Sequence, residues 1–191
     1  ADATQSPDSW SSPQMKSRND RYGGVAVTIH WLSAVAVFVA VGSGFAAAMA
    51  VDSADKARLL QLHVPMATAV LVLTVVRIAW WRLMDCKPGP VLGVPRWQER
   101  SARAVHALLY IILFLMLGSG IALLVVSGAG NALFGGYGTL PDFTQFAPRT
   151  AHGVGALLIV LLIAAHVGAA LYHQFVRRDS ILRRMWYARS G

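Results

Sequence analysis

Four long runs without a single Asp, Glu, Lys or Arg divide this 191-residue chain. They extend over residues 22–51, 59–76, 104–141 and 150–176. A hydrocarbon core about 30 Å thick is crossed by roughly 18 to 20 apolar residues of helix, so each run is long enough to span a bilayer. We therefore predict transmembrane helices near residues 25–50, 59–82, 103–127 and 150–176. The third run exceeds one span and leaves room for an external loop.

The composition agrees with a membrane protein. Hydrophobic residues make up 55% of the chain and charged residues only 14%, a balance that does not suit a water-soluble domain of this size. Four spans in succession predict an all-α membrane protein, built as a four-transmembrane-helix bundle whose helices run alternately up and down.

The basic residues lie mostly on one side of the predicted bundle. The net charge is +8, and fourteen of the 17 Lys and Arg residues flank the start of the first span, the connection between the second and third, and the end of the fourth. Only Lys56, Arg58 and Arg149 fall on the other side. The positive-inside rule then predicts that both termini are cytoplasmic. The charge is explained by topology and by anionic lipid headgroups, and we expect no nucleic-acid partner.

The segments outside the spans are short or irregular. Residues 1–20 are rich in polar residues and are expected to form a disordered cytoplasmic tail, and residues 186–191 a basic C-terminal tail. We expect no cleavable signal peptide, so the first span stays as an anchor of the domain formed by residues 21–185. Cys86, the single cysteine, lies in a Pro-rich cytoplasmic loop. It excludes an internal disulfide and a thiolate cluster for iron–sulfur or zinc.

Four histidines lie inside the predicted spans: His30, His63, His152 and His166. His152 and His166 are fourteen residues apart in one span, which on an α-helix corresponds to about 21 Å of rise and nearly four turns. Both rings therefore project from one helix face, toward opposite sides of the bilayer. A single histidine in a span can simply hydrogen-bond a neighbouring backbone group, but four at matched depths indicate function.

The depths of these histidines pair His30 with His166 in the cytoplasmic half and His63 with His152 near the outer ends. We therefore predict two haem groups, each held by two histidines. No C-x-x-C-H motif is present, so the haems would be bound non-covalently. Two imidazoles complete the coordination of the iron, so such a site passes single electrons and does not bind oxygen.

Two further histidines, His106 and His173, lie near the cytoplasmic ends of the third and fourth spans. They could pair with each other, donate to a haem propionate, line a quinone pocket or be solvated.

Glycines in the first and third spans are also open to two interpretations. Gly42, Gly44, Gly118 and Gly120 could serve helix–helix contacts, because small residues let backbones approach. A flat porphyrin would need the same clearance.

Short motifs are spread along residues 21–185: Arg21-Tyr22, Ile29-His30-Trp31-Leu32, Leu62-His63-Val64, Val75-Val76-Arg77, Val105-His106-Ala107-Leu108-Leu109-Tyr110, Leu133-Phe134-Gly135, Thr139-Leu140-Pro141, His152 and His166. As a set they resemble the prokaryotic cytochrome b561 family. The resemblance implies a four-helix cytochrome of the bacterial inner membrane with two b-type haems, ligated by His30, His63, His152 and His166. Members of the family include superoxide:ubiquinone oxidoreductases.

The chain departs from the family pattern at two places. The segment before Arg21 is longer than the family's amino terminus, and Gln174 stands where a second histidine often follows the one matching His173. Neither departure touches the implied ligands.

Two arginines are candidates for the site. Arg149 precedes His152 by three residues and so shares its helix face. With Lys56 and Arg58 it could steer a small anion such as superoxide toward the outer haem, pair with a propionate, or merely stand at the start of the helix. Arg77 is expected to pair with a propionate of the inner haem, because a buried guanidinium suits a carboxylate.

Three functions are compatible with these residues. The first is an enzyme that oxidises superoxide at the outer face and reduces ubiquinone. The second is a membrane cytochrome b subunit that relays electrons between the quinone pool and a partner dehydrogenase or oxidase. The third, a histidine-based metal transporter, is disfavoured because no Asp or Glu lies within the four spans.

Overall fold

Four long α-helices form the protein in the computed structural model, which describes residues 15–89, 93–179 and 181–186. They are α1 (Gly24–Met49), α2 (Ser53–Ala79), α3 (Arg96–Ser127) and α4 (Ala147–Tyr172). All four are long and apolar enough to cross a membrane. No strand occurs among the described residues, so the predicted all-α fold with four transmembrane helices is confirmed.

Two of the helices, α2 and α3, begin six and seven residues earlier than hydropathy predicts. α2 starts at Ser53 instead of residue 59, because the Asp52 side chain accepts hydrogen bonds from the backbone N–H groups of Ala54 and Asp55 and caps the helix. α3 starts at Arg96, directly after Pro95, instead of at residue 103. Hydropathy marks the part of a helix that lies in hydrocarbon, whereas these first turns are polar and extend the helices beyond it.

Short helices continue or connect the long ones. α2 runs on into the π-helical turn η1 (Trp80–Met84), and α4 into η4 (His173–Arg177). The loop after α3, where we expect an external connection, contains the π-helical turn η2 (Asn131–Gly135) and the short 3-10 helix η3 (Phe143–Gln145). Gln61 on α2 donates a hydrogen bond of 2.7 Å to the Leu133 carbonyl, which ties η2 to the bundle.

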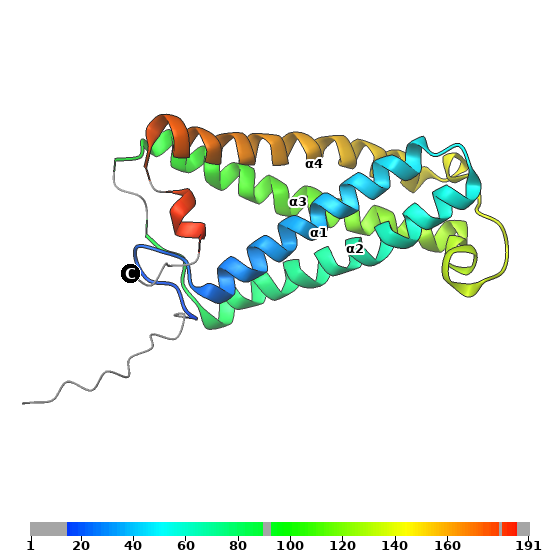
Figure 1. Cartoon of the computed structure of the whole chain (residues 1–191), viewed down its shortest axis with the longest axis horizontal. Helices are drawn as coiled ribbons and strands as arrows, with labels where there is room; N and C mark the ends of the chain where they lie inside the picture. The colour runs from blue at the N-terminus through cyan, green and yellow to red at the C-terminus, as the bar shows by residue number, and fades with distance from the viewer. Residues whose placement is uncertain (1–14, 90–92, 180, 187–191) are drawn as a thin grey trace, which may run out of the picture.

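The four helices are arranged as two antiparallel hairpins (Figure 1). α1 packs along α2 and α3 packs along α4, whereas contacts between the two hairpins are sparse. Residues 15–23, η1, the start of α3, η4 and the 3-10 helix η5 (Leu182–Met185) gather at one end of the bundle, which we call the terminal end. The α1–α2 connection, η2 and η3 lie at the other, the loop end.

Small buried residues let α1 approach α2 closely. On α1 they recur at intervals of three and four positions, which places them on one helix face: Ala36, Ala40, Ser43 and Ala47. Across the seam α2 buries Val70 and Thr74. The Ser43 and Thr74 hydroxyls donate to carbonyls of their own helices, at 2.6 and 2.7 Å, so no hydroxyl in the seam lacks a partner. The α1–α2 hairpin is thus held by close van der Waals packing of small residues, as expected in a bilayer.

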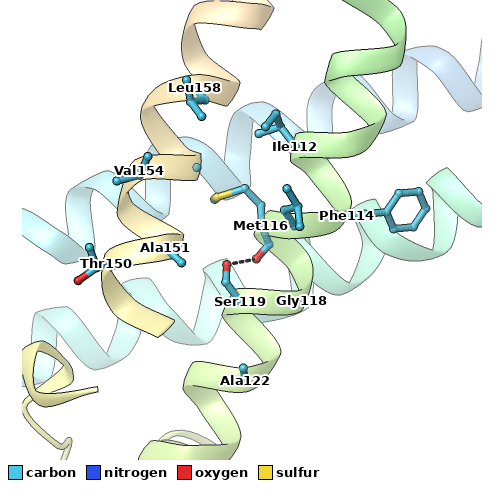
Figure 2. Close-up of a pocket in the computed structure, with 12 residues that line it drawn as sticks. Ile112, Phe114, Met116, Gly118, Ser119, Ala122, Thr150, Ala151, Val154 and Leu158 are labelled. Atoms are coloured by element: carbon cyan, nitrogen blue, oxygen red, sulfur yellow. Dashed lines mark hydrogen bonds between the residues drawn. The ribbon is translucent and has the colours of Figure 1, made fainter. Parts of the chain in front are cut away.

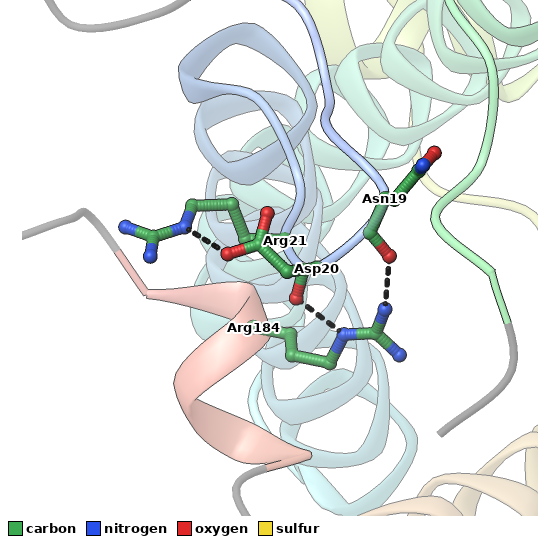
Figure 3. A network of polar contacts seen from close by, with 4 residues as sticks. All are labelled: Asn19, Asp20, Arg21 and Arg184. Atoms are coloured by element: carbon green, nitrogen blue, oxygen red, sulfur yellow. Dashed lines mark hydrogen bonds and ion pairs between the residues drawn. The ribbon is translucent and has the colours of Figure 1, made fainter. Parts of the chain in front are cut away.

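Hydrogen bonds at the terminal end join segments that are far apart in the sequence. Arg184 donates to the backbone carbonyls of Asp20 and Asn19, at 2.7 and 2.9 Å (Figure 3). Ser17 donates through its hydroxyl and its backbone N–H to the Asp85 carboxylate. Partial burial raises the pKa of Asp85, but the hydrogen bonds from Ser17, the Cys86 N–H and Trp80 together outweigh it and leave that pKa below its ordinary value. We call these contacts the terminal clasp.

Most of the two expected tails cannot be compared with the structure, since residues 1–14 and 187–191 lie outside the described residues. The remainder of the predicted N-terminal tail, residues 15–20, takes part in the terminal clasp.

The α1 seam yields a stability prediction. Ala36 is 7% exposed, so Ala36→Leu adds volume where none is free and should lower the free energy of unfolding by about 1 to 3 kcal/mol. Val35 is 61% exposed, and Val35→Leu should leave stability within about 0.5 kcal/mol of the original. Unfolding in SDS, followed by helical circular dichroism, measures both. Equal stability of the two variants would contradict the packing described for the seam.

Candidate functional site

Histidine rings face one another across the two hairpins at two levels of the bundle. Toward the loop end, the ring centroids of His63 on α2 and His152 on α4 are 6.0 Å apart. Toward the terminal end, those of His30 on α1 and His166 on α4 are 6.3 Å apart. These are the pairs that depth in the sequence predicts, and we call them the loop-end pair and the terminal-end pair. Their role as iron ligands stays a prediction.

The two separations fit a metal ion held between two imidazoles. A metal–imidazole bond is about 2 Å long, so two rings on opposite sides of one ion have centroids roughly 6 to 6.5 Å apart. Among the described residues, no group of three or more His, Cys, Asp or Glu side chains is arranged to hold a metal ion. A metal ion held between the two rings of either pair would have only those two ligands from the described residues and would have to bring its others with it, as haem does.

The loop-end pair is held in one orientation by backbone carbonyls. His63 Nδ1 donates to the Ala40 carbonyl at 2.8 Å, and His152 Nδ1 to the Met116 carbonyl at 3.1 Å. The Ser119 hydroxyl also lies 3.1 Å from His152 Nδ1 and itself donates to the Met116 carbonyl. Since a carbonyl only accepts, each Nδ1 carries the proton and each Nε2 keeps its lone pair. This is the tautomer that a metal-binding histidine needs.

An apolar groove lies between α3 and α4 beside this pair. It has a volume of about 680 Å³, and Figure 2 shows Met116, Ser119 and Thr150 among the residues that line it. Met116 and Ser119 are also the residues that hold the His152 ring. The other lining residues, such as Val154 and Leu158, are apolar, so the groove suits a hydrocarbon chain rather than a polar ligand.

More polar groups gather around the terminal-end pair. The ring of His106 on α3 lies 5.1 Å from that of His166, and the Arg77 guanidinium interacts electrostatically with His30, His106 and His166. The structure therefore brings together His30, His166, His106 and Arg77, which the sequence places in the cytoplasmic half.

Two polar atoms at this level are buried without a hydrogen-bond partner among the described residues: His30 Nδ1 and Arg77 Nε. A buried polar atom without a partner is destabilising, by about 1 to 3 kcal/mol for a neutral group. Both atoms therefore fit a site that a bound group completes, and an arginine at such a place suits a carboxylate.

The remaining candidates lie near the ends of the bundle. Arg149, in the first turn of α4, interacts electrostatically with His152. Arg58, which the sequence groups with it, is 3.7 Å from the Asp55 carboxylate. His173 Nδ1 is 2.6 Å from the Asp179 carboxylate, and the His106 ring lies against that of His166 instead.

Sequence reasoning misses the groups that orient the loop-end histidines. Ala40 and Met116 act through their backbone carbonyls, so their side chains give no sign of this role in the sequence. A usable signal does exist near both, because the tripeptide Gly-Ser-Gly occurs at residues 42–44 and again at 118–120.

Comparison with known families matches residues 21–188 to the family described as prokaryotic cytochrome b561. The chain belongs to this family. As a member of the prokaryotic cytochrome b561 family it is a multi-pass membrane haem protein that takes part in electron transfer, and its haem is b-type. The predicted family is thereby confirmed.

Curated relatives agree with membership of the cytochrome b561 family. Cytochrome b561 homolog 2 of Escherichia coli is 28% identical over 173 residues, which cover 87% of this chain and 91% of the relative. Cytochrome b561 homolog 1 of the same organism is 35% identical over 103 residues, covering 51% and 58%. Cytochrome b562 of Cereibacter sphaeroides is 33% identical over 128 residues, covering 65% of each chain. No solved structure matches significantly.

The ring geometry yields a prediction about haem loss in this cytochrome b561 family member. His63→Ala and His152→Ala should each remove the same haem, because their rings face one another, while His30→Ala and His166→Ala should each remove the other. Reduced-minus-oxidised spectra of the purified variants, with a haem count per chain, measure this. His173→Ala, whose ring faces Asp179, is the control and should keep the full haem content. Loss of different haems from the two variants of one pair would contradict the pairing.

Proposed function

We propose that this chain carries single electrons across the bacterial inner membrane, from superoxide at the loop end to ubiquinone. In the balanced reaction, two superoxide anions each lose one electron and become dioxygen. One ubiquinone gains those two electrons and two protons and becomes ubiquinol. The observation that carries the proposal is the presence of two histidine pairs at different depths of one bundle, each joining the two hairpins.

Two b-type haems are part of this proposal, one bound by His63 and His152 and one by His30 and His166. When bound, each haem supplies a reversible one-electron couple of its iron. With two histidines holding each haem, the protein would leave no coordination site for superoxide or dioxygen, so each haem would exchange single electrons only.

The chain's own residues have distinct tasks in the proposal. The Ala40 and Met116 carbonyls keep Nδ1 of the loop-end histidines protonated, so that Nε2 would be available to bind the haem iron. Arg77, whose buried Nε lacks a partner, would bind a propionate carboxylate at the terminal-end site. His106, whose ring lies beside His166, would donate to a second propionate or to the quinone.

The orientation of the electron path follows from the distribution of charge. Fourteen of the 17 basic residues belong to the predicted cytoplasmic side, so we assign the terminal end to the cytoplasm and the loop end to the outer face. The cations at the loop end are then the first charges that an external anion meets. Among them Arg149 is the one that interacts electrostatically with His152, whereas Arg58 lies near Asp55. Arg149 is therefore the residue we assign to steering superoxide.

Stopped-flow spectroscopy tests the enzyme directly. Mixing the oxidised protein with superoxide should reduce the haems rapidly, and ubiquinone should reoxidise them. If dithionite reduces both haems but superoxide reduces neither, the superoxide-oxidising enzyme is excluded. The alternative function is then favoured, in which the chain relays electrons between the quinone pool and a partner dehydrogenase or oxidase. Purification from native membranes would then be expected to recover that partner in stoichiometric amount.

Charge at the loop end yields a further prediction. Arg149→Gln should lower the second-order rate constant for reduction by superoxide by about tenfold at low salt, and should weaken its dependence on ionic strength, because electrostatic steering is lost. Arg103→Gln removes the same charge from an exposed position on α3, near the terminal end, and should leave the rate constant unchanged. Equal rate constants for the two variants would remove Arg149 from the proposed mechanism.

A further inference from the structure

The two loop-end histidines are seated on their neighbouring helices in the same way. His63 bonds the Ala40 carbonyl of α1, and its ring lies against Gly44, where a Cβ would be only 2.9 Å from Nδ1 and Cε1. His152 bonds the Met116 carbonyl of α3, and a Cβ on Gly120 would be 3.1 Å from its Cε1. In each case the carbonyl and the glycine are four residues apart, hence one turn apart on the same helix face.

The spacing of the residues around these histidines is the same in both hairpins. The Gly-Ser-Gly tripeptides begin twelve residues after His30 in α1 and twelve residues after His106 in α3. In the return helices, His63 and Arg77 are fourteen residues apart, as are His152 and His166. The two hairpins therefore share the same spacing of these residues. Arg77 in α2 takes the position that His166 takes in α4.

Only the second glycine of each tripeptide lies against a histidine ring. A Cβ on Gly42 or on Gly118 would have no atom of the described residues within 4 Å apart from its own helix neighbours. Residues i and i+2 lie about 200° apart around a helix, so the two glycines of each tripeptide point to nearly opposite sides. The contact with an imidazole ring is therefore made by Gly44 and Gly120 and not by Gly42 and Gly118.

We propose that Gly44 and Gly120 are positioning residues that set the orientation of the loop-end haem ligands. An added methyl group at either position would push the ring away from the carbonyl that fixes its tautomer. His63 would be displaced more than His152, since its ring is the closer of the two. The inference rests on the proposed function, because it takes His63 and His152 to be ligands of one haem.

Four single substitutions test the proposal. Gly44→Ala and Gly120→Ala place a methyl group against a ring, whereas Gly42→Ala and Gly118→Ala place the same group in open space on the same helices. We expect Gly44→Ala to weaken retention of the loop-end haem by about tenfold or more, as changes that disturb ligand orientation do. Gly120→Ala should have a smaller effect of the same kind. Both control variants should match the original protein.

The readouts separate positioning from a general loss of structure. They are the haem content, the midpoint potential of each haem, and the EPR signal of the ferric loop-end haem, which responds to the orientation of its two imidazoles. The terminal-end haem should keep its potential and spectrum in every variant, because its ligands do not touch these glycines, and so it reports that the bundle is folded. Should Gly44→Ala fail to accumulate, Gly120→Ala decides by the same comparison with Gly118→Ala.

The outcomes distinguish this inference from the function on which it rests. If the unsubstituted protein does not bind two haems, the proposed function fails first. If it binds two, and the loop-end haem of Gly44→Ala and Gly120→Ala matches that of their controls in content, potential and EPR signal, the positioning role is wrong while the proposed function stands.

Discussion

The requirement that a polar ring inside a membrane find a hydrogen-bond partner governs the placement of the loop-end histidines. No water is available in the hydrocarbon core, so the partner must come from the protein, and here it is a carbonyl oxygen of the neighbouring helix in the same hairpin. That carbonyl is within reach only because the two helices approach closely. The small buried residues of α1, such as Ala40 and Ser43, thus affect the geometry of the site as well as the packing of the bundle.

The spans and the depths of the histidines could be predicted from the sequence, because both follow from hydropathy and the rise of a helix. The starts of α2 and α3 could not, since Asp52 and Pro95 begin these helices outside the apolar run that hydropathy detects. Nor could the terminal clasp, where Arg184 meets the carbonyls of Asn19 and Asp20. Contacts between distant segments leave no periodic pattern, and backbone acceptors carry no residue signature.

For the candidate site, too, the sequence predicts which side chains take part, whereas their surroundings depend on tertiary contacts. The positions of seven side chains in the sequence predict a role in the site, and the structure places them in two layers: His30, Arg77, His106 and His166 in one, and His63, His152 and Arg149 in the other. The layers differ in character. At the loop end both rings are anchored to carbonyls, whereas the terminal-end layer holds two buried nitrogen atoms, Arg77 Nε and His30 Nδ1, without partners among the described residues. This difference depends on tertiary contacts and is not visible in the spacing of the histidines.

The placement of two rings on one helix also restricts how the chain can change in length. One residue inserted into α4 between His152 and His166 would turn one ring by about 100° relative to the other and move it by about 1.5 Å along the axis. One of the two rings would then face away from the opposite hairpin. The connection that holds η2 and η3 lies outside α4, so a change in its length would leave the angle between the two rings unchanged. The spacing within α4 is therefore the length on which the two histidine pairs depend.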